Sequence, residues 1–185
     1  MSGEAGARRP HRPVEGDPPS IDEYRALMGL YPTGVTVVTS MGGRGPAGIT
    51  VNAIASLSLD PILLMVGFGV QSRTLAVVRE AGRFAVNILA RDQEDVSRLF
   101  ASKLPERQKF ADVPYELVHG VPILDGCVAF LVCDTHAFHP GGDHLVVVGG
   151  VVAMGPEHTG RKPLLFYRGT YRGLGSEDEE SPPGT

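Results

Sequence analysis

The sequence predicts a mostly β domain, an antiparallel barrel flanked by short helices. Several segments are rich in β-branched and aromatic residues, whereas helical patterns are few and short. Strands and helices do not alternate as in a doubly wound sheet, and the glycines at 43, 45 and 48, which match G-x-G-x-x-G, lead into a second β-branched strand and not into a helix. These observations favour antiparallel pairing over a Rossmann-type dinucleotide fold.

The first elements are a short helix and a hairpin. Ser20 and Glu23 form a capping box that starts a helix ending near Met28, and Pro32 prevents its continuation. Strands are expected at 35–39 and 49–54, because both segments are β-branched and the glycine-rich turn 41–46 separates them.

The central part contains two strands and two short helices. The apolar run 62–68 and segment 84–89 are expected to be strands. Between them, Ser72 caps a helix that continues to about Arg79, and after them Asp92 caps a second helix. That second helix carries Val96, Leu99 and Phe100 on one face.

The last third contains one long irregular stretch and the longest strands. Residues 103–126 are polar and contain proline, so a long loop is expected there. Segments 128–136 and 145–154 are expected to be long strands, and 163–171 a final one.

The folded domain is expected to span residues 20–174 of the 185-residue chain. The arm 1–19 has almost no large apolar side chains and the tail 175–185 has none, so both are expected to be disordered. The acidic side chains of the tail account for the net charge of −4, so the body is close to neutral. A neutral body argues against nucleic acid as a partner.

The compartment is expected to be the cytoplasm. Arg8, Arg9 and Arg12 are not followed by the apolar region of a signal peptide, and the run 62–70 is too short to cross a bilayer. Cys127 and Cys133 lie six residues apart without a C-x-x-C motif, which indicates buried thiols and no cysteine zinc site.

Small and polar residues line the second strand of the first hairpin and the bend after it. Gly48, Thr50, Asn52 and Ala53 lie on a strand, and the serine-rich bend that includes Ser58 comes after it. A flat aromatic ring needs such a surface, with apolar contact for its faces and donors for its polar edge. The alternative is a hairpin with a serine-rich loop.

A second candidate is the helix start at Ser72, Arg73 and Thr74. The free amides and dipole of a helix N-terminus attract phosphate, and two hydroxyls and a guanidinium add donors. The alternative is an ordinary helix cap.

A third candidate is the glycine turn at 141–142, which places His144 at the start of an apolar strand. A neutral imidazole in this position is suited to a nicotinamide carboxamide; the alternative is a half-buried hairpin histidine. A metal site with His136, His139, Asp143 and His144 is not expected, because Pro140 and two glycines interrupt the segment, which offers no helical i,i+4 pair and no H-E-x-x-H motif.

Two further segments are open to two interpretations. Tyr167 and Arg168 lie in a mixed polar and aromatic stretch that suits a cofactor rim or an exposed edge strand. Phe100 is most simply a core residue. Neither a G-x-S-x-G nucleophile elbow nor a Walker loop occurs in the sequence.

In combination, these segments resemble the short-chain flavin reductases, the reductase components of two-component flavin-dependent monooxygenases. The resemblance covers residues 22–174 and rests on motifs that occur in the same order: PTGVTVVT at 32–39, GITVNA at 48–53, SLSLDP at 56–61, SRT at 72–74, GRFAVNIL at 82–89, GDH at 142–144 and LLFYRG at 164–169.

The resemblance implies a split β-barrel, antiparallel and Greek-key-like, that binds FAD or FMN, usually as a homodimer. It implies reduction of the flavin by NADH, with NADPH less favoured since no basic cluster awaits a 2′-phosphate. Reduced flavin would pass to a separate monooxygenase. Two alternatives remain: an oxidase of a small molecule that retains its flavin, and a non-enzymatic flavin- or haem-binding protein.

The resemblance also assigns roles to residues. Gly48, Thr50, Asn52 and Ala53 would lie along the isoalloxazine ring, with Ser58 nearby. Ser72, Arg73 and Thr74 would face the phosphate, and Phe100 would border the flavin. His144 would align the nicotinamide, with Tyr167 and Arg168 close by. Many relatives have serine at the position of Ala53, so one hydroxyl contact to the flavin is absent here.

Overall fold

The computed structural model describes residues 18–156 and 160–175. Within these ranges, seven strands form one antiparallel sheet in the order β3-β2-β6-β9-β10-β5-β4. Their bounds are β2 (Thr36–Gly42), β3 (Gly45–Val51), β4 (Ile54–Leu59), β5 (Ile62–Gly69), β6 (Arg83–Ile88), β9 (Ala129–Gly141) and β10 (His144–Pro156).

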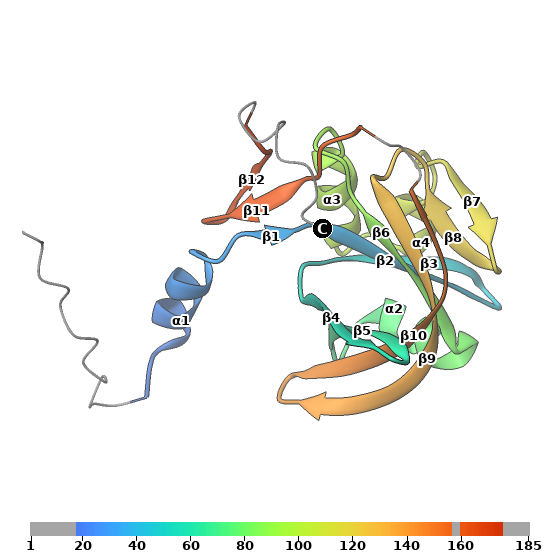
Figure 1. Ribbon diagram of the computed structural model, residues 1–185, viewed down its shortest axis with the longest axis horizontal. Helices are drawn as coiled ribbons and strands as arrows, with labels where there is room; N and C mark the ends of the chain where they lie inside the picture. Colours follow the sequence, from blue (N-terminus) through green and yellow to red (C-terminus); the bar gives the residue numbers. More distant parts are fainter. Residues whose placement is uncertain (1–17, 157–159, 176–185) are drawn as a thin grey trace, which may run out of the picture.

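The two outer strands of this sheet, β3 and β4, are consecutive in the chain. Only Asn52 and Ala53 join them, and the Ala53 carbonyl accepts a 2.8 Å hydrogen bond from the amide of Gly67 in β5. The sheet therefore curls until its two edges approach one another, which gives the barrel in Figure 1 and confirms the predicted mostly β, antiparallel architecture.

Two small sheets complete the strand content of the described residues. β1 (Thr33–Gly34) pairs with β11 (Leu165–Tyr167), which forms a hairpin with β12 (Thr170–Arg172). Arg168 and Gly169 both have positive φ in the turn of that hairpin, as a two-residue type I′ turn requires. The single strand predicted at 163–171 is thus two short strands.

A second hairpin lies where a loop was expected. β7 (Tyr115–Val118) and β8 (Val121–Leu124) pair within the stretch 103–126, which also contains the short helix α4 (Glu106–Lys109). Long-range bonds anchor β8: the Thr39 hydroxyl donates to the Pro122 carbonyl, and the Leu124 amide donates to the buried Asn87 side chain. The expectation of an irregular excursion here was wrong.

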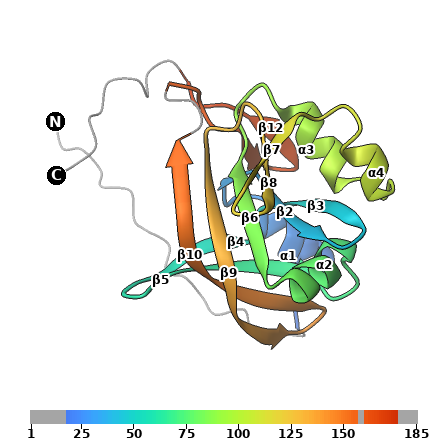
Figure 2. The ribbon, with the colours of Figure 1, turned by 90° about the vertical axis from the view of Figure 1, so that its right-hand side faces the viewer.

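The helices lie outside the barrel. α1 (Ile21–Met28) begins at the Ser20 capping box and α2 (Arg73–Ala81) at Ser72, both as predicted. α3 (Glu94–Ala101) begins after Gln93, because the Asp92 carboxylate forms an ion pair with Arg161 and does not cap the helix. Figure 2 shows α3 and α4 beside one another near β3. No helix in the described part of the chain is long and apolar enough to span a membrane.

The core fills the barrel and the space beneath α3. One cluster lies inside the sheet around Phe68 and Phe84, and a second packs Phe100, Phe110 and Leu164 below α3. Cys127 and Cys133 are buried and form no disulfide, and burial raises the pKa of the Cys133 thiol to about 12. The arm and tail predicted to be disordered lie almost entirely outside the described residues.

Candidate functional site

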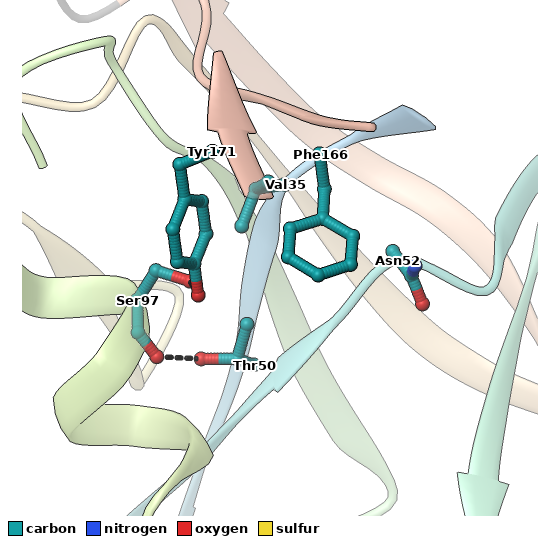
Figure 3. Close-up of a pocket in the computed structure, with 6 residues that line it drawn as sticks. All are labelled: Val35, Thr50, Asn52, Ser97, Phe166 and Tyr171. Carbon is teal, nitrogen blue, oxygen red and sulfur yellow. Dashed lines mark hydrogen bonds between the residues drawn. The ribbon is translucent and has the colours of Figure 1, made fainter. Parts of the chain in front are cut away.

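A small cavity of about 110 Å³ opens where β3 meets the β11–β12 hairpin and α3 (Figure 3). Its walls are Val35, Thr50, Asn52, Ser97, Phe166 and Tyr171. The Phe166 and Tyr171 rings extend from the hairpin toward Thr50 and contact one another edge-to-face, with centroids 5.2 Å apart. One side of the cavity is therefore aromatic and the other polar.

The polar side is held by hydrogen bonds to α3. The Thr50 hydroxyl donates to the Ser97 carbonyl at 2.6 Å, and the Ser97 and Tyr171 hydroxyls lie 2.9 Å apart. The Arg98 guanidinium lies over the Tyr171 ring, 4.8 Å from its centroid. The Thr50 proton is thus committed to the protein, and its oxygen remains available as an acceptor.

A larger cavity of about 410 Å³ adjoins the first. It shares Asn52 and Phe166 with the small cavity and is otherwise lined by Tyr24, Arg25, Met28, Gly29, Tyr31, Thr33 and Gly169. Its size falls in the range of ligand pockets, about 300–1,000 Å³. The Thr33 hydroxyl oxygen is buried in this region without a hydrogen-bond partner among the described residues, so a polar ligand atom would satisfy it.

The strand residues predicted to contact a ring lie together, but in different environments. Thr50 and Asn52 line the cavities, and the Asn52 side chain is exposed. Gly48 is buried: a Cβ there would lie 2.6 Å from a ring carbon of Phe100. Ser58 lies in β4, at a register irregularity opposite Leu63, because the predicted bend at 56–61 is largely strand.

Phe100 itself has no exposed surface and packs edge-to-face on Phe110, with centroids 5.0 Å apart. It therefore forms the floor beneath Gly48, which agrees with the simpler core interpretation of that residue. Its expected position bordering a ligand remains untested.

The helix start predicted for phosphate is tied to the rest of the molecule. The Ser72 side chain accepts from the amide of Leu75, and Thr74 is buried, with 2% exposure. The Arg73 guanidinium lies 3.3 Å from Glu106 and also donates to the carbonyls of Lys103 and Leu104. The main-chain amides of the first turn are what this helix offers to an anion.

His144 lies at the end of the long β9–β10 ribbon, opposite Gly69 in β5. Its Nδ1 is 2.7 Å from the Asp143 carboxylate, and this hydrogen bond lowers the pKa of Asp143. The amide of Val70 bonds to the Asp143 carbonyl and that of Ser72 to the Gly69 carbonyl. The histidine therefore stands close to the start of α2, with its side chain exposed.

Tyr167 and Arg168 lie at the turn of the β11–β12 hairpin. The Arg168 guanidinium carbon is 5.3 Å from the centre of the Tyr167 ring, and the Arg168 amide donates to the Gly29 carbonyl. This bond fixes the end of α1 beside the larger cavity.

Sequence reasoning missed several cavity residues. Val35, Ser97, Phe166 and Tyr171 lie within the predicted strands and helix, and α1 forms a wall of the larger cavity through Tyr24 and Met28. The signal in the sequence was a short, well-capped helix that carries the large side chains Tyr24, Leu27 and Met28. In the structure all three side chains are exposed.

Comparisons with known proteins agree on one family. Residues 28–175 match the model of the flavin reductase like domain. The reductase subunit HsaB of a flavin-dependent monooxygenase from Mycobacterium tuberculosis is 39% identical over 164 residues, covering 86% of this chain and 84% of HsaB. The NADH-dependent FMN reductase AsuE2 of Streptomyces nodosus subsp. asukaensis is 36% identical, covering 92% of this chain and 94% of AsuE2.

A solved structure gives the same relationship in three dimensions. The Streptomyces globisporus NADH:FAD oxidoreductase SgcE6, in complex with NAD and FAD fragments, superposes with a TM-score of 0.79 at 34% identity. The superposition covers 84% of this chain and 93% of that protein.

Proposed function

This chain belongs to the family of flavin reductase-like domains, and from that premise we propose that it reduces FMN or FAD with NADH and supplies reduced flavin to a separate monooxygenase. The observation that carries the proposal is the pair of adjoining cavities at Thr50, Asn52 and Phe166, in a chain similar along most of its length to NADH-dependent flavin reductases.

The cavities suit a flat ring with polar edges. Phe166 and Tyr171 offer apolar contact, the Asn52 amide offers a donor and an acceptor, and the buried Thr33 hydroxyl lacks a partner among the described residues. We assign Gly48, Thr50, Asn52 and Ala53 to the ring. Ser58, on β4, is assigned to the surroundings of the flavin ring.

The start of α2 is assigned to the flavin phosphate. Because Ser72 caps the helix and Thr74 is buried, this assignment relies on main-chain amides of the first turn, with Arg73 adding positive charge. Phe100 supports the ring from below through Gly48, and Tyr167 and Arg168 lie in the chain between Phe166 and Gly169, which line the larger cavity.

The protein contributes binding and alignment, and no side-chain base is required. When both are bound, the nicotinamide supplies a hydride that the flavin accepts. His144 is assigned to hold the nicotinamide, and Asp143 fixes the orientation of its imidazole. Main-chain amides and the Asn52 amide stabilise negative charge on the reduced ring. Alignment of two reactants can account for several kcal/mol of a barrier.

A homodimer is part of this proposal. The apolar residues of α1 and the following turn are exposed, with Ile21 and Leu27 each 69% exposed. Leu59, Ile62 and Met154 are also exposed, on β4, β5 and β10 of the barrel wall. Apolar surface of this extent supports a covering partner, and a second copy of the chain is proposed. Sedimentation equilibrium tests it, since a monomer at micromolar concentration would contradict the assignment.

The decisive experiment is anaerobic stopped-flow with each flavin and each nicotinamide in pairs. We expect NADH to bleach added FMN or FAD in the presence of the protein, and NADPH to act more slowly. An oxidase that retains its flavin would elute with it from gel filtration and need no added flavin. A non-enzymatic binding protein would bind flavin without oxidising NADH.

A further inference from the structure

One turn of helix, α4, stands beside the free edge of β3. β3 is an outer strand of the sheet, so its outward peptide groups have no neighbouring strand. At Gly48, two side chains of α4 form the hydrogen bonds that a neighbouring strand would otherwise provide. The Gly48 amide donates to Glu106 Oε2 at 3.0 Å, and Lys109 Nζ donates to the Gly48 carbonyl at 3.1 Å.

The lysine in this arrangement is buried. Lys109 is 3% exposed, and its ammonium also donates to the Phe100 carbonyl at 3.2 Å and lies 3.6 Å from Glu106 Oε1. Desolvation lowers the pKa of Lys109, and the Glu106 carboxylate opposes that effect. A buried cation needs such partners, so the ammonium ties Gly48 to the end of α3.

The same carboxylate reaches the phosphate side of the site. Glu106 Oε1 is 3.3 Å from the Arg73 guanidinium at the start of α2. Its side chain therefore lies between the strand assigned to the ring and the helix assigned to the phosphate. Gly48 and Thr50 are two residues apart in β3 and so lie on one face of the strand, and Asn52 follows directly after its end. A displacement of Gly48 therefore moves the two residues that line the cavity.

We propose that Glu106 and Lys109 are positioning residues for flavin reduction. They act through the Gly48 peptide and do not contact either reactant. By holding that peptide, they fix the position of Thr50 and Asn52 relative to the flavin ring. The inference depends on the proposed function, because it concerns the alignment of the same flavin.

Lys109→Met tests the pair, since it keeps the unbranched stem and removes the donor. Single-turnover bleaching of saturating FMN by saturating NADH is followed under argon, well below the melting temperature. We expect the rate constant to fall about tenfold at full amplitude, because misaligned reactants react slowly while every molecule remains folded. Lys109→Arg is expected to restore the rate constant to within about threefold, since a guanidinium also donates to carbonyls.

A stability control separates alignment from folding. Val121 is a buried residue of β8 and belongs to a different apolar cluster, so Val121→Ala should lower the melting temperature and leave the rate constant unchanged. A purely structural role for Lys109 predicts the same pattern, namely a lower melting temperature with a wild-type rate constant, and that result would overturn the proposal.

A second substitution covers the case in which Lys109→Met does not fold. Glu106→Gln keeps an acceptor for the Gly48 amide and removes the charge beside Lys109 and Arg73, so a rate constant about threefold below wild type is expected. A wild-type rate constant for this variant contradicts the positioning role. A wild-type protein that fails to bleach FMN with NADH contradicts the proposed function itself.

Discussion

The hydroxyl of Thr50 and the carbonyl of Ser97 are joined by a 2.6 Å hydrogen bond that links β3 to the middle of α3 at the wall of the small cavity. Serine and threonine hydroxyls have one proton. The bond therefore leaves the Thr50 oxygen able only to accept from a ligand.

Thr50→Val should weaken both folding and flavin binding. The Ser97 carbonyl loses its donor, which costs about 1 kcal/mol of unfolding free energy, and the cavity loses an acceptor. Urea unfolding and a flavin titration measure the two effects. Thr36→Val is the matched control: Thr36 makes the same kind of bond, to the Val51 carbonyl at 2.6 Å, and lines neither cavity. Equal flavin affinities in the two variants would remove Thr50 from the site.

Gly48→Ala should destabilise the protein by about 1–3 kcal/mol, the usual cost of overpacking. Its Cβ would lie 2.6 Å from a ring carbon of Phe100, which is fully buried and cannot move aside. Phe100→Leu in the same chain should recover part of the loss. Gly150→Ala is the control, because its Cβ would meet nothing closer than 3.9 Å. Thermal unfolding distinguishes them, and a neutral Gly48→Ala would contradict the close approach.

His144→Ala should raise the KM for NADH about fivefold, equivalent to one lost hydrogen bond of about 1 kcal/mol, while the Kd for oxidised flavin changes less. Steady-state kinetics and a flavin titration give the two constants. His139→Ala serves as control, since His139 is exposed on the same ribbon, opposite Val146. Unchanged kinetics in His144→Ala would refute the assignment.

Asp134 should make stability depend on pH in the acid range. A 2.6 Å hydrogen bond from Arg83 lowers the pKa of Asp134 below its ordinary 3.8, with smaller contributions from the charges of Arg83 and His119. Because the folded pKa is the lower one, this stabilisation is complete above the unfolded value and is lost as the pH falls through the folded value.

The test compares urea midpoints of wild type and Asp134→Asn from pH 7 to pH 3. The difference should be constant between pH 7 and pH 5 and should shrink below pH 3.8. Arg83→Met should show the same dependence. A difference that persists at pH 3 would assign the stabilisation to packing of the pair and not to its charge.

Local chemistry made much of the fold predictable. The Ser20 and Ser72 caps depend on residues three positions apart in the chain. Long β-branched runs such as 145–154 indicate strands by composition alone. The prediction that Asp92 caps a helix was wrong because its carboxylate pairs with Arg161, 69 residues away. The β7–β8 hairpin was missed because its anchors, Thr39 and Asn87, come from other parts of the barrel.

The site was predictable in part for the same reason. Thr50 and Asn52 stand out as polar residues at the end of an apolar strand, and both line the cavities. Tyr171 and Ser97 join them only through a contact between segments 74 residues apart in the chain. The buried Lys109 gives no sequence signal either, since its surroundings come from Gly48 and Phe100.

The two-residue link between β3 and β4 determines where the wall of the barrel can part. A fully closed barrel would have no free edges. In this barrel the two outer strands, β3 and β4, are successive in the chain, and Asn52 lies in the link between them. The opening is therefore inherited with the chain topology. Changes in the loops at the far ends of the strands can alter neighbouring surfaces without moving the two cavities that Asn52 lines.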